Sequence, residues 1–254
     1  MVDFLDERLL EEPSKADQRK YILNLLARIC QASRCFPARL RHVPIDSTSR
    51  QLVSAGGLGI VYRGNYKGQN VCVKAIRTYN AKESIILPAL GRDLALWAQA
   101  DHPNVLPIYG VYMSDPTMKE SICMVSPWAD YGDLRCFLKK HPATSCAPLI
   151  ADIILGLEYL HNVDLVHTEL ETTNILISND LRAMIADFGI THILQGSSDT
   201  NTGFTGCSNW IAPELVQEHS LPTKASDIWG FACTSFEVPN PANYATNTVL
   251  TMGN

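Results

Sequence analysis

The feature that most constrains the fold is a change in hydrophobic period near the middle of the chain. Up to Pro127, β-branched segments such as "QLVSA", "GIVYRG" and "QNVCVKAIR" alternate with Gly and Asn turns, which is typical of an antiparallel sheet. One helical stripe interrupts them, at Leu90, Leu94 and Trp97. Beyond Gly132, apolar residues recur at helical spacing, as in Ile150, Ile153, Ile154, Leu157 and Leu160. We therefore predict an α+β protein with two lobes, the first rich in strands and the second in helices.

Residues 1–49 carry one helical pattern ahead of the strands. Ser14 and Asp17 have a spacing like that of a capping box, and the apolar residues that follow repeat with a helical period at Ile22, Leu25, Leu26 and Ile29. The helix is expected to end before Pro37. A polar linker is predicted over residues 38–49, and the apolar face of the helix needs a partner, for which we expect the following domain.

Composition excludes several classes of function. The 254 residues are 46% hydrophobic and carry a net charge of −5, so the chain can bury a core but offers no basic field to nucleic acid or anionic lipid. The acidic start does not resemble a signal peptide, and no apolar run is long enough to cross a bilayer. The 8 cysteines show no paired Cys-x-x-Cys spacing, which favours free thiols over disulfides or zinc. We expect a cytoplasmic or otherwise intracellular protein.

A glycine cluster lies between the first two predicted strands. In "VSAGGLGIVYRG", Gly56, Gly57 and Gly59 lack side chains, so backbone N–H groups there can approach phosphates. An ordinary hairpin turn gives the same pattern, and no Gly-Lys-Ser/Thr follows to make a P-loop.

The order of the later motifs is more specific. After the glycines come "VCVKAI", "DHPNVLPIYGV", "LVHTELETTNILI", "IADFGI", "NWIAPELV" and "ASDIWGF". This series resembles the protein kinases, and most closely their tyrosine-kinase-like group of Ser/Thr kinases. The resemblance implies a kinase-like domain over residues 50–238, with an N-lobe at 50–129 and an incomplete, mainly helical C-lobe at 130–238. Residues 239–254 are expected to be an unstructured tail.

The resemblance also implies ATP and Mg²⁺ as ligands. Lys74 should hold the α- and β-phosphates, although a lysine in an apolar strand is also read as a snorkelling edge residue. Cys72 and Val61 should cover one face of the adenine and Leu176 the other. Asn174 and Asp187 should bind the metal, with turn residues as the alternative reading. The full set of expected nucleotide-binding positions is Val53, Gly56, Gly57, Gly59, Val61, Cys72, Lys74, Pro127, Ala129 and Leu176.

Several positions depart from the family pattern. Glu169 takes the place of the Asp that accepts the substrate proton, and its extra methylene displaces the carboxylate. Glu171 stands where Ser/Thr kinases have a lysine that neutralises the transferred phosphate. Asp93 replaces the helix Glu that pairs with the strand lysine, and Thr168 replaces an Arg. Glu214 is expected to lack its partner from a late helix, which leaves apolar surface exposed.

Three hypotheses about function follow from this pattern. The first is a pseudokinase-like protein that binds Mg·ATP, transfers phosphate weakly or not at all, and serves as a binding or scaffold module for a protein partner. The second is an active Ser/Thr protein kinase with Glu169 as base and Lys74, Asn174 and Asp187 in their family roles. The third is a nonfunctional truncated product.

Overall fold

The structure is a computed structural model that forms two compact units. The first unit takes its residues from 1–101 and 107–128, and the second from 102–106 and 129–239. The residues described are 1–11, 16–41, 43–45, 50–55, 59–76, 83–112, 123–187, 210–216 and 220–239.

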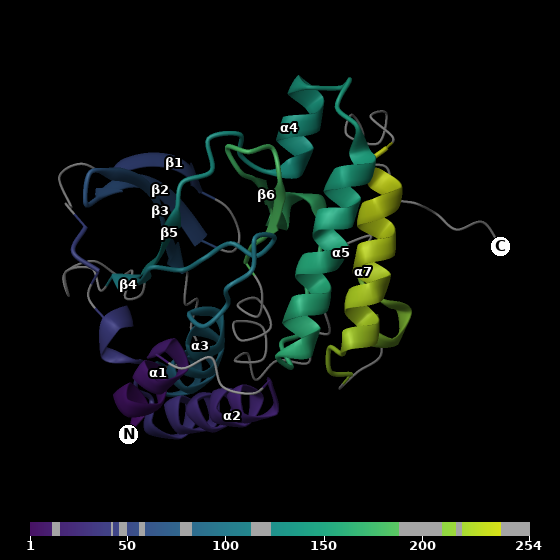
Figure 1. The fold of residues 1–254 in the computed structure, drawn as a ribbon. Helices are drawn as coiled ribbons and strands as arrows, with labels where there is room; N and C mark the ends of the chain where they lie inside the picture. Colours follow the sequence, from purple (N-terminus) through teal and green to yellow (C-terminus); the bar gives the residue numbers. More distant parts are fainter. Residues whose placement is uncertain are drawn as a thin grey trace. The chain divides into compact units, whose positions relative to one another are not determined.

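The first unit contains a five-stranded antiparallel sheet (Figure 1). The strand order is β1-β2-β3-β5-β4, so β4 lies at one edge. Lys67 and Gly68 join β2 to β3 with φ values of 51° and 81°, as a two-residue type I′ hairpin requires. The predicted antiparallel sheet and its single helix are confirmed, as β1 (Gln51–Ala55), β2 (Gly59–Tyr66), β3 (Gln69–Ile76), β4 (Gly110–Tyr112), β5 (Cys123–Pro127) and α3 (Glu83–Trp97).

The N-terminal segment contains two helices where the sequence predicted one. The expected helix is α2 (Ala16–Ser33), which ends before Pro37, while the additional helix is α1 (Val2–Glu11). α1 buries Val2, Leu5 and Leu9, which have the spacing of one helical face. The expected Ser14–Asp17 capping box lies outside the part of the chain whose side chains are described.

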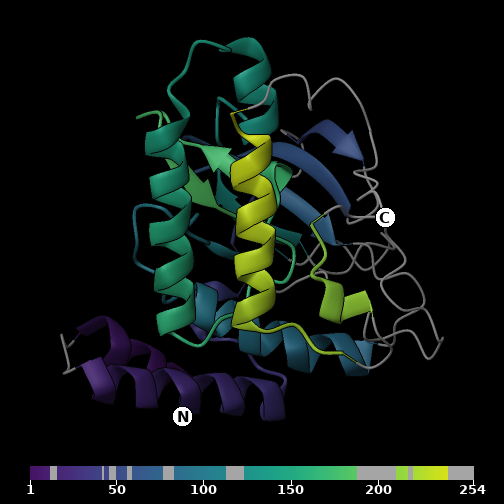
Figure 2. The ribbon, with the colours of Figure 1, turned by 90° about the vertical axis from the view of Figure 1, so that its right-hand side faces the viewer.

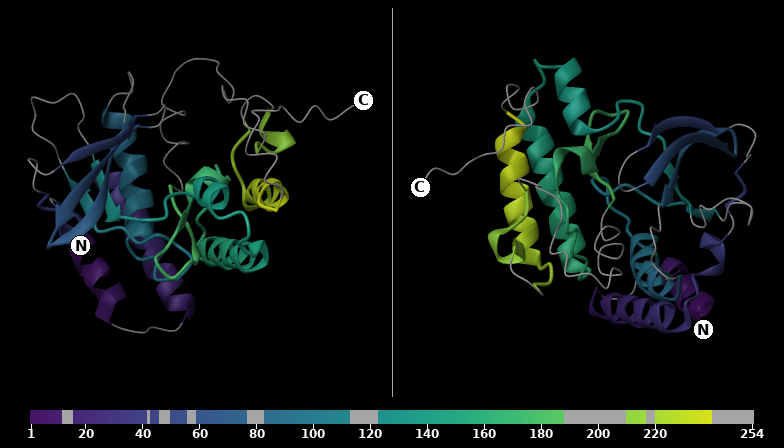
Figure 3. Two further views of the ribbon diagram at one scale, coloured as in Figure 1. Left: turned by 90° about the horizontal axis from the view of Figure 1, so that it is seen from above. Right: turned by 180° about the vertical axis from the view of Figure 1, so that it is seen from behind.

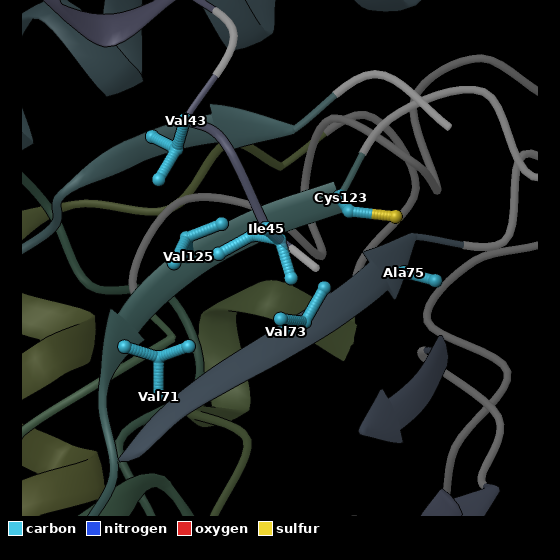
Figure 4. Close-up of a cluster of buried hydrophobic side chains, with 7 residues drawn as sticks. All are labelled: Val43, Ile45, Val71, Val73, Ala75, Cys123 and Val125. Atoms are coloured by element: carbon cyan, nitrogen blue, oxygen red, sulfur yellow. The ribbon is translucent and has the colours of Figure 1, made fainter. Parts of the chain in front are cut away.

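The polar linker predicted after α2 is wrong for residues 38–41 and 43–45. A 3₁₀ turn, η1 (Ala38–Leu40), buries Leu40, and Val43 and Ile45 are also buried. The Val43 N–H donates to the Val111 carbonyl at 3.0 Å, so the segment pairs with the edge strand β4. Figure 4 shows Val43 and Ile45 beside the buried side chains of β3 and β5, namely Val71, Val73, Ala75, Cys123 and Val125.

The second unit is mainly helical, as predicted, and α5 and α7 lie side by side in it (Figure 2). The stripe on α5 packs inward through Ile153, Leu157 and Leu160. At Gly156 an added Cβ would lie 2.5 Å from the Asn104 carbonyl oxygen, so only glycine fits there. Among the described residues, every helix is too short or too polar to cross a bilayer. The elements of the unit are α4 (Leu134–Lys140), α5 (Cys146–Asn162), η3 (Thr172–Asn174), β6 (Ile175–Ile177), β7 (Ala183–Ile185), η4 (Pro213–Val216) and α7 (Lys224–Glu237).

Candidate active site

Three of the expected nucleotide-binding side chains share one face of the first unit's sheet. Lys74 pairs with Val61 across β2 and β3, and Cys72 lies two residues before Lys74 on β3. Directly opposed residues point to the same side of an antiparallel sheet, as do residues two apart on one strand. Val61, Cys72 and Lys74 are each partly exposed, whereas Val71, Val73 and Ala75 are fully buried. The N-terminal segment therefore covers one face of the sheet. The other face carries the three expected ligand-binding residues.

The ends of the neighbouring strands carry other expected positions. Val53 is the extra residue of a β-bulge in β1, because Leu52 pairs with Tyr62 while Ser54 pairs with Val61. It is half exposed. Gly59 opens β2, while Gly56 and Gly57 lie outside the described residues.

Backbone groups at the end of β5 and just after it form hydrogen bonds. Pro127 is the last residue of β5, and the Trp128 N–H donates to the Asn70 carbonyl at 3.3 Å. In the second unit, the Ala129 carbonyl accepts from the Gly132 N–H at 3.1 Å. The resemblance implies that adenine bonds to the Pro127 carbonyl, and this carbonyl is retained because proline lacks only the N–H.

Asp93 lies on α3 with a side chain that is 13% exposed, and its carboxylate is 3.7 Å from Arg92. Burial raises the pKa of Asp93 to about 7, although Arg92 opposes the rise. Among the described residues, Arg92, its neighbour on the helix, is an ionic partner of Asp93. Pairing with Lys74, expected from the resemblance, stays a prediction.

In the second unit, a buried carboxylate at the start of α7 holds the loop around Glu169. Asp227 Oδ2 accepts the His167 N–H at 2.8 Å, and Oδ1 accepts the Thr168 N–H at 2.8 Å. His161 Nε2 also lies 2.8 Å from Oδ2. Asp227 is 2% exposed and sits in the first turn of a capped helix, where the helix dipole stabilises negative charge. Sequence reasoning assigned it no role, although the acid after the Thr223–Ser226 capping box was a usable signal.

His167 is buried and fixed in one tautomer. Its Nδ1 accepts the Glu169 N–H at 3.2 Å, and its Nε2 lies 2.9 Å from the Ala186 carbonyl. A carbonyl only accepts, so the proton is on Nε2. Burial lowers the pKa of His167, which favours this neutral form.

Thr168, between these anchored residues, has a strained backbone. Its φ is +77°, a conformation that β-branched residues rarely adopt. The Thr168 Oγ1 atom is buried with no hydrogen-bond partner among the described residues. The hydrogen bond from the Thr168 N–H to the Asp227 carboxylate holds the residue in this conformation.

We expect Thr168→Gly to raise the free energy of unfolding by at least about 1 kcal/mol. Removing left-handed strain gains about 1–2 kcal/mol and removing the unpaired hydroxyl about 1–3 kcal/mol, against a glycine entropy cost of about 0.5–1 kcal/mol. Urea denaturation measures the change. Thr168→Ala removes the hydroxyl but keeps Cβ, and a Thr168→Gly protein less stable than Thr168→Ala would contradict the strain.

The expected metal ligands lie on neighbouring parts of the second unit. Asn174 Nδ2 donates to the Glu169 carbonyl at 2.7 Å, so its Oδ1 remains the atom that suits a cation. The Ala186 N–H donates to the Asn174 carbonyl at 2.9 Å, which ties the residue before Asp187 to Asn174. The oxygens of Asn174 and Asp187 fit Mg²⁺ completed by phosphate and water. Within the described ranges, no group of three or more His, Cys, Asp or Glu side chains could hold a metal by itself. Leu176 lies on β6, immediately after η3.

Glu171 lies in the same loop and bonds to its own neighbour. The Thr173 hydroxyl donates to the Glu171 carboxylate. Next to it, the buried Thr172 hydroxyl donates to Glu237 Oε2 at 3.0 Å, and Arg135 lies 3.1 Å from Glu237 Oε1. Burial raises the pKa of Glu237 despite Arg135, and Glu171 contributes to that rise. Glu171 thus adds negative charge beside an already acidic buried group.

Two further features of the sequence concern the segment before α7. Glu214 lies exposed in η4. The resemblance also offers five hydroxyl-bearing residues for regulatory phosphorylation, with a simple polar loop as the alternative, and all five lie outside the described residues: Ser197, Ser198, Thr200, Thr202 and Thr205.

Comparison with known proteins agrees with these features. The family "protein tyrosine and serine/threonine kinase" matches residues 48–250. The chain belongs to the protein kinase family. "Cell division control protein 7" of Schizosaccharomyces pombe is 32% identical over 196 residues, covering 74% of this chain and 18% of that protein. The Xenopus laevis "mitogen-activated protein kinase kinase kinase 10" is 32% identical over 203 residues, covering 74% of this chain and 19% of that protein.

The Arabidopsis thaliana "serine/threonine/tyrosine-protein kinase HT1" is 28% identical over 193 residues, covering 73% of this chain. The matched region is 48% of that protein, so the chain spans less than half the length of these relatives.

Proposed function

We propose that this kinase-family chain binds Mg·ATP and transfers phosphate weakly or not at all, acting as a binding or scaffold module for a protein partner. The nucleotide part of the proposal is supported by the shared sheet face of Val61, Cys72 and Lys74. It is also supported by the oxygen donors of Asn174 and Asp187, which Mg²⁺ would use to hold the phosphates.

The proposal that phosphate transfer is weak or absent rests on the carboxylates around the Glu169 loop. Glu171 occupies the position of the family's phosphate-neutralising lysine, and buried Glu237 lies close enough for its pKa to respond to Glu171. At about 4 Å from the transferred phosphate and an effective dielectric near 20, a lysine would attract it by about 4 kcal/mol, whereas a carboxylate repels it by a comparable amount. A transferred phosphoryl group carries negative charge, so an acid here raises the barrier where a cation would lower it.

A second candidate, an active kinase acting on protein Ser or Thr hydroxyls, is favoured by the anchored backbone of the loop. Asp227 and Asn174 fix the main chain on both sides of Glu169, through bonds at 2.8 Å to Thr168 and 2.7 Å to the Glu169 carbonyl. A rigid loop limits the misplacement that the longer Glu169 side chain introduces, and a misplacement of about 1 Å costs about a hundredfold in rate.

One experiment separates the two candidates. Mg·ATP at about 100 times its Kd should stabilise the native chain by about 2.7 kcal/mol, seen as a rise in Tm, and Lys74→Met should abolish the rise. Transfer to a generic protein substrate should be undetectable for the native chain and should appear in Glu169→Asp/Glu171→Lys. Robust transfer by the native chain that Lys74→Met removes establishes the active kinase instead. Absence of a Tm rise with the native chain refutes nucleotide binding.

A further inference from the structure

The N-terminal segment supplies the C-terminal cap of α3. The last turn of α3 contains no basic side chain of its own. Just beyond the helix, the Ala98 carbonyl accepts from Arg39 Nη2 at 3.0 Å and the Gln99 carbonyl from Arg19 Nη2 at 3.2 Å. Carbonyls at a helix C-terminus lack intrahelical partners and attract cations. Two guanidinium groups from residues 1–45 therefore meet the negative end of α3.

These two arginines are themselves fixed by α1. The Asp6 carboxylate receives Arg39 through two bonds, at 2.6 Å and 3.0 Å, and is 2% exposed. Gln99 Nε2 donates to Asp6 Oδ1 at 2.7 Å, and Arg19 Nη1 donates to the Leu9 carbonyl at 2.8 Å. We call Asp6, Arg19, Arg39 and Gln99 the α3 clamp. Each of its bonds is directional, so the clamp specifies one position for the end of α3, which apolar packing alone would leave adjustable.

α2 also packs closely along α3 (Figure 3). An added Cβ on Gly91 would lie 3.1 Å from the Cys30 carbonyl oxygen and 3.7 Å from the Phe36 ring, so this face of α3 faces the N-terminal segment. Asp93 follows two residues later, about 200° around the helix. The N-terminal segment therefore packs against the side of α3 opposite to Asp93.

We propose that residues 1–45 are a built-in positioning element, in which the α3 clamp fixes α3 and so the place of Asp93 in the first unit. The consequence for ligand binding rests on the proposed function: a loosened α3 weakens Mg·ATP binding. Arg19, Arg39 and Asp6 are thus positioning residues that do not touch the nucleotide.

The test compares Arg19→Met/Arg39→Met with Arg41→Met. Methionine keeps a similar apolar stem, and Arg41 is a matched control because it donates to the Phe36 carbonyl within its own segment, at 2.7 Å. Hydrogen exchange of the backbone amides in residues 94–100 reports the end of α3, and amides of β5, in the same unit, report opening of the whole unit. Mg·ATP affinity is measured on the same proteins by titration calorimetry at a temperature where all are folded.

The double variant should exchange about tenfold faster at residues 94–100, with β5 unchanged, because several charge-assisted bonds are lost. Its Kd for Mg·ATP should rise about threefold to tenfold. Unchanged exchange at α3, or an equal effect of Arg41→Met, overturns the clamp. Faster exchange with unchanged affinity in a chain that binds Mg·ATP overturns the positioning role. If the native chain does not bind Mg·ATP, the proposed function fails, and the exchange of α3 alone decides whether the clamp holds the helix.

Discussion

Replacing Asp227 with alanine is expected to lower the free energy of unfolding by about 3–5 kcal/mol. The carboxylate is 2% exposed and receives two backbone N–H groups and one imidazole. Each buried donor left without a partner costs about 1–3 kcal/mol. Relaxation of the strained φ of Thr168, which the bond to Asp227 holds, offsets only part of this loss.

Urea denaturation of Asp227→Ala and Asp227→Asn measures this effect. Asparagine keeps the shape but offers one acceptor oxygen instead of two, so it should also destabilise, by about 2 kcal/mol. Glu158→Ala is the control, since Glu158 is an exposed carboxylate on α5, and it should change stability by less than about 0.5 kcal/mol. A loss below about 1 kcal/mol for Asp227→Ala would show that Asp227 is not the anchor of the loop.

The sequence predicts the sheet and the longer helices well because their signals are local. Alternation in β2 and β3 decides which side chains share a face, so the two-residue period of a strand is enough to group Cys72 with Lys74. The α5 stripe at Ile153, Leu157 and Leu160 likewise follows from helical spacing alone.

The N-terminal segment is less predictable because its structure depends on contacts distant in sequence. Val43 pairs with Val111, and Arg39 reaches the end of α3. A short segment of this kind has no period of its own, so its composition favours a polar linker over residues 38–49. The acidic residues of α1 also obscure the i, i+3, i+7 pattern of Val2, Leu5 and Leu9.

The candidate site, too, was predictable from the sequence only in part. The motif order identifies Glu169, Asn174 and Asp187, but the bond from Thr173 to Glu171 depends on side-chain rotamers that no spacing specifies. The role of Asp227 depends on a bond to a backbone 59–60 residues away. Residue types could be expected from the sequence, whereas hydrogen-bond partners required the folded chain.

Asp93→Asn is expected to stabilise the protein at pH 8 and to leave its stability nearly unchanged at pH 4. Burial raises the Asp93 pKa from 3.8 to about 7 in the folded protein. Between these values the folded state binds more protons than the unfolded state, so the contribution of Asp93 is favourable at low pH and is lost as the pH rises through about 7. The difference in pKa corresponds to about 4 kcal/mol, which the uncharged amide does not incur.

The measurement is the free energy of unfolding of both proteins from pH 4 to pH 8. The lowered pKa of His167 makes stability fall as the pH drops below about 6.5, but both proteins share that group, so it cancels in their difference. Asp180→Asn, at an exposed carboxylate in the second unit, should give a difference that is flat with pH. If the Asp93→Asn difference is equally flat, Asp93 is ionised in the folded protein at neutral pH. A difference that grows by several kcal/mol between pH 5 and pH 8 instead means that the helix carrying Asp93 is stabilised by the protonated acid.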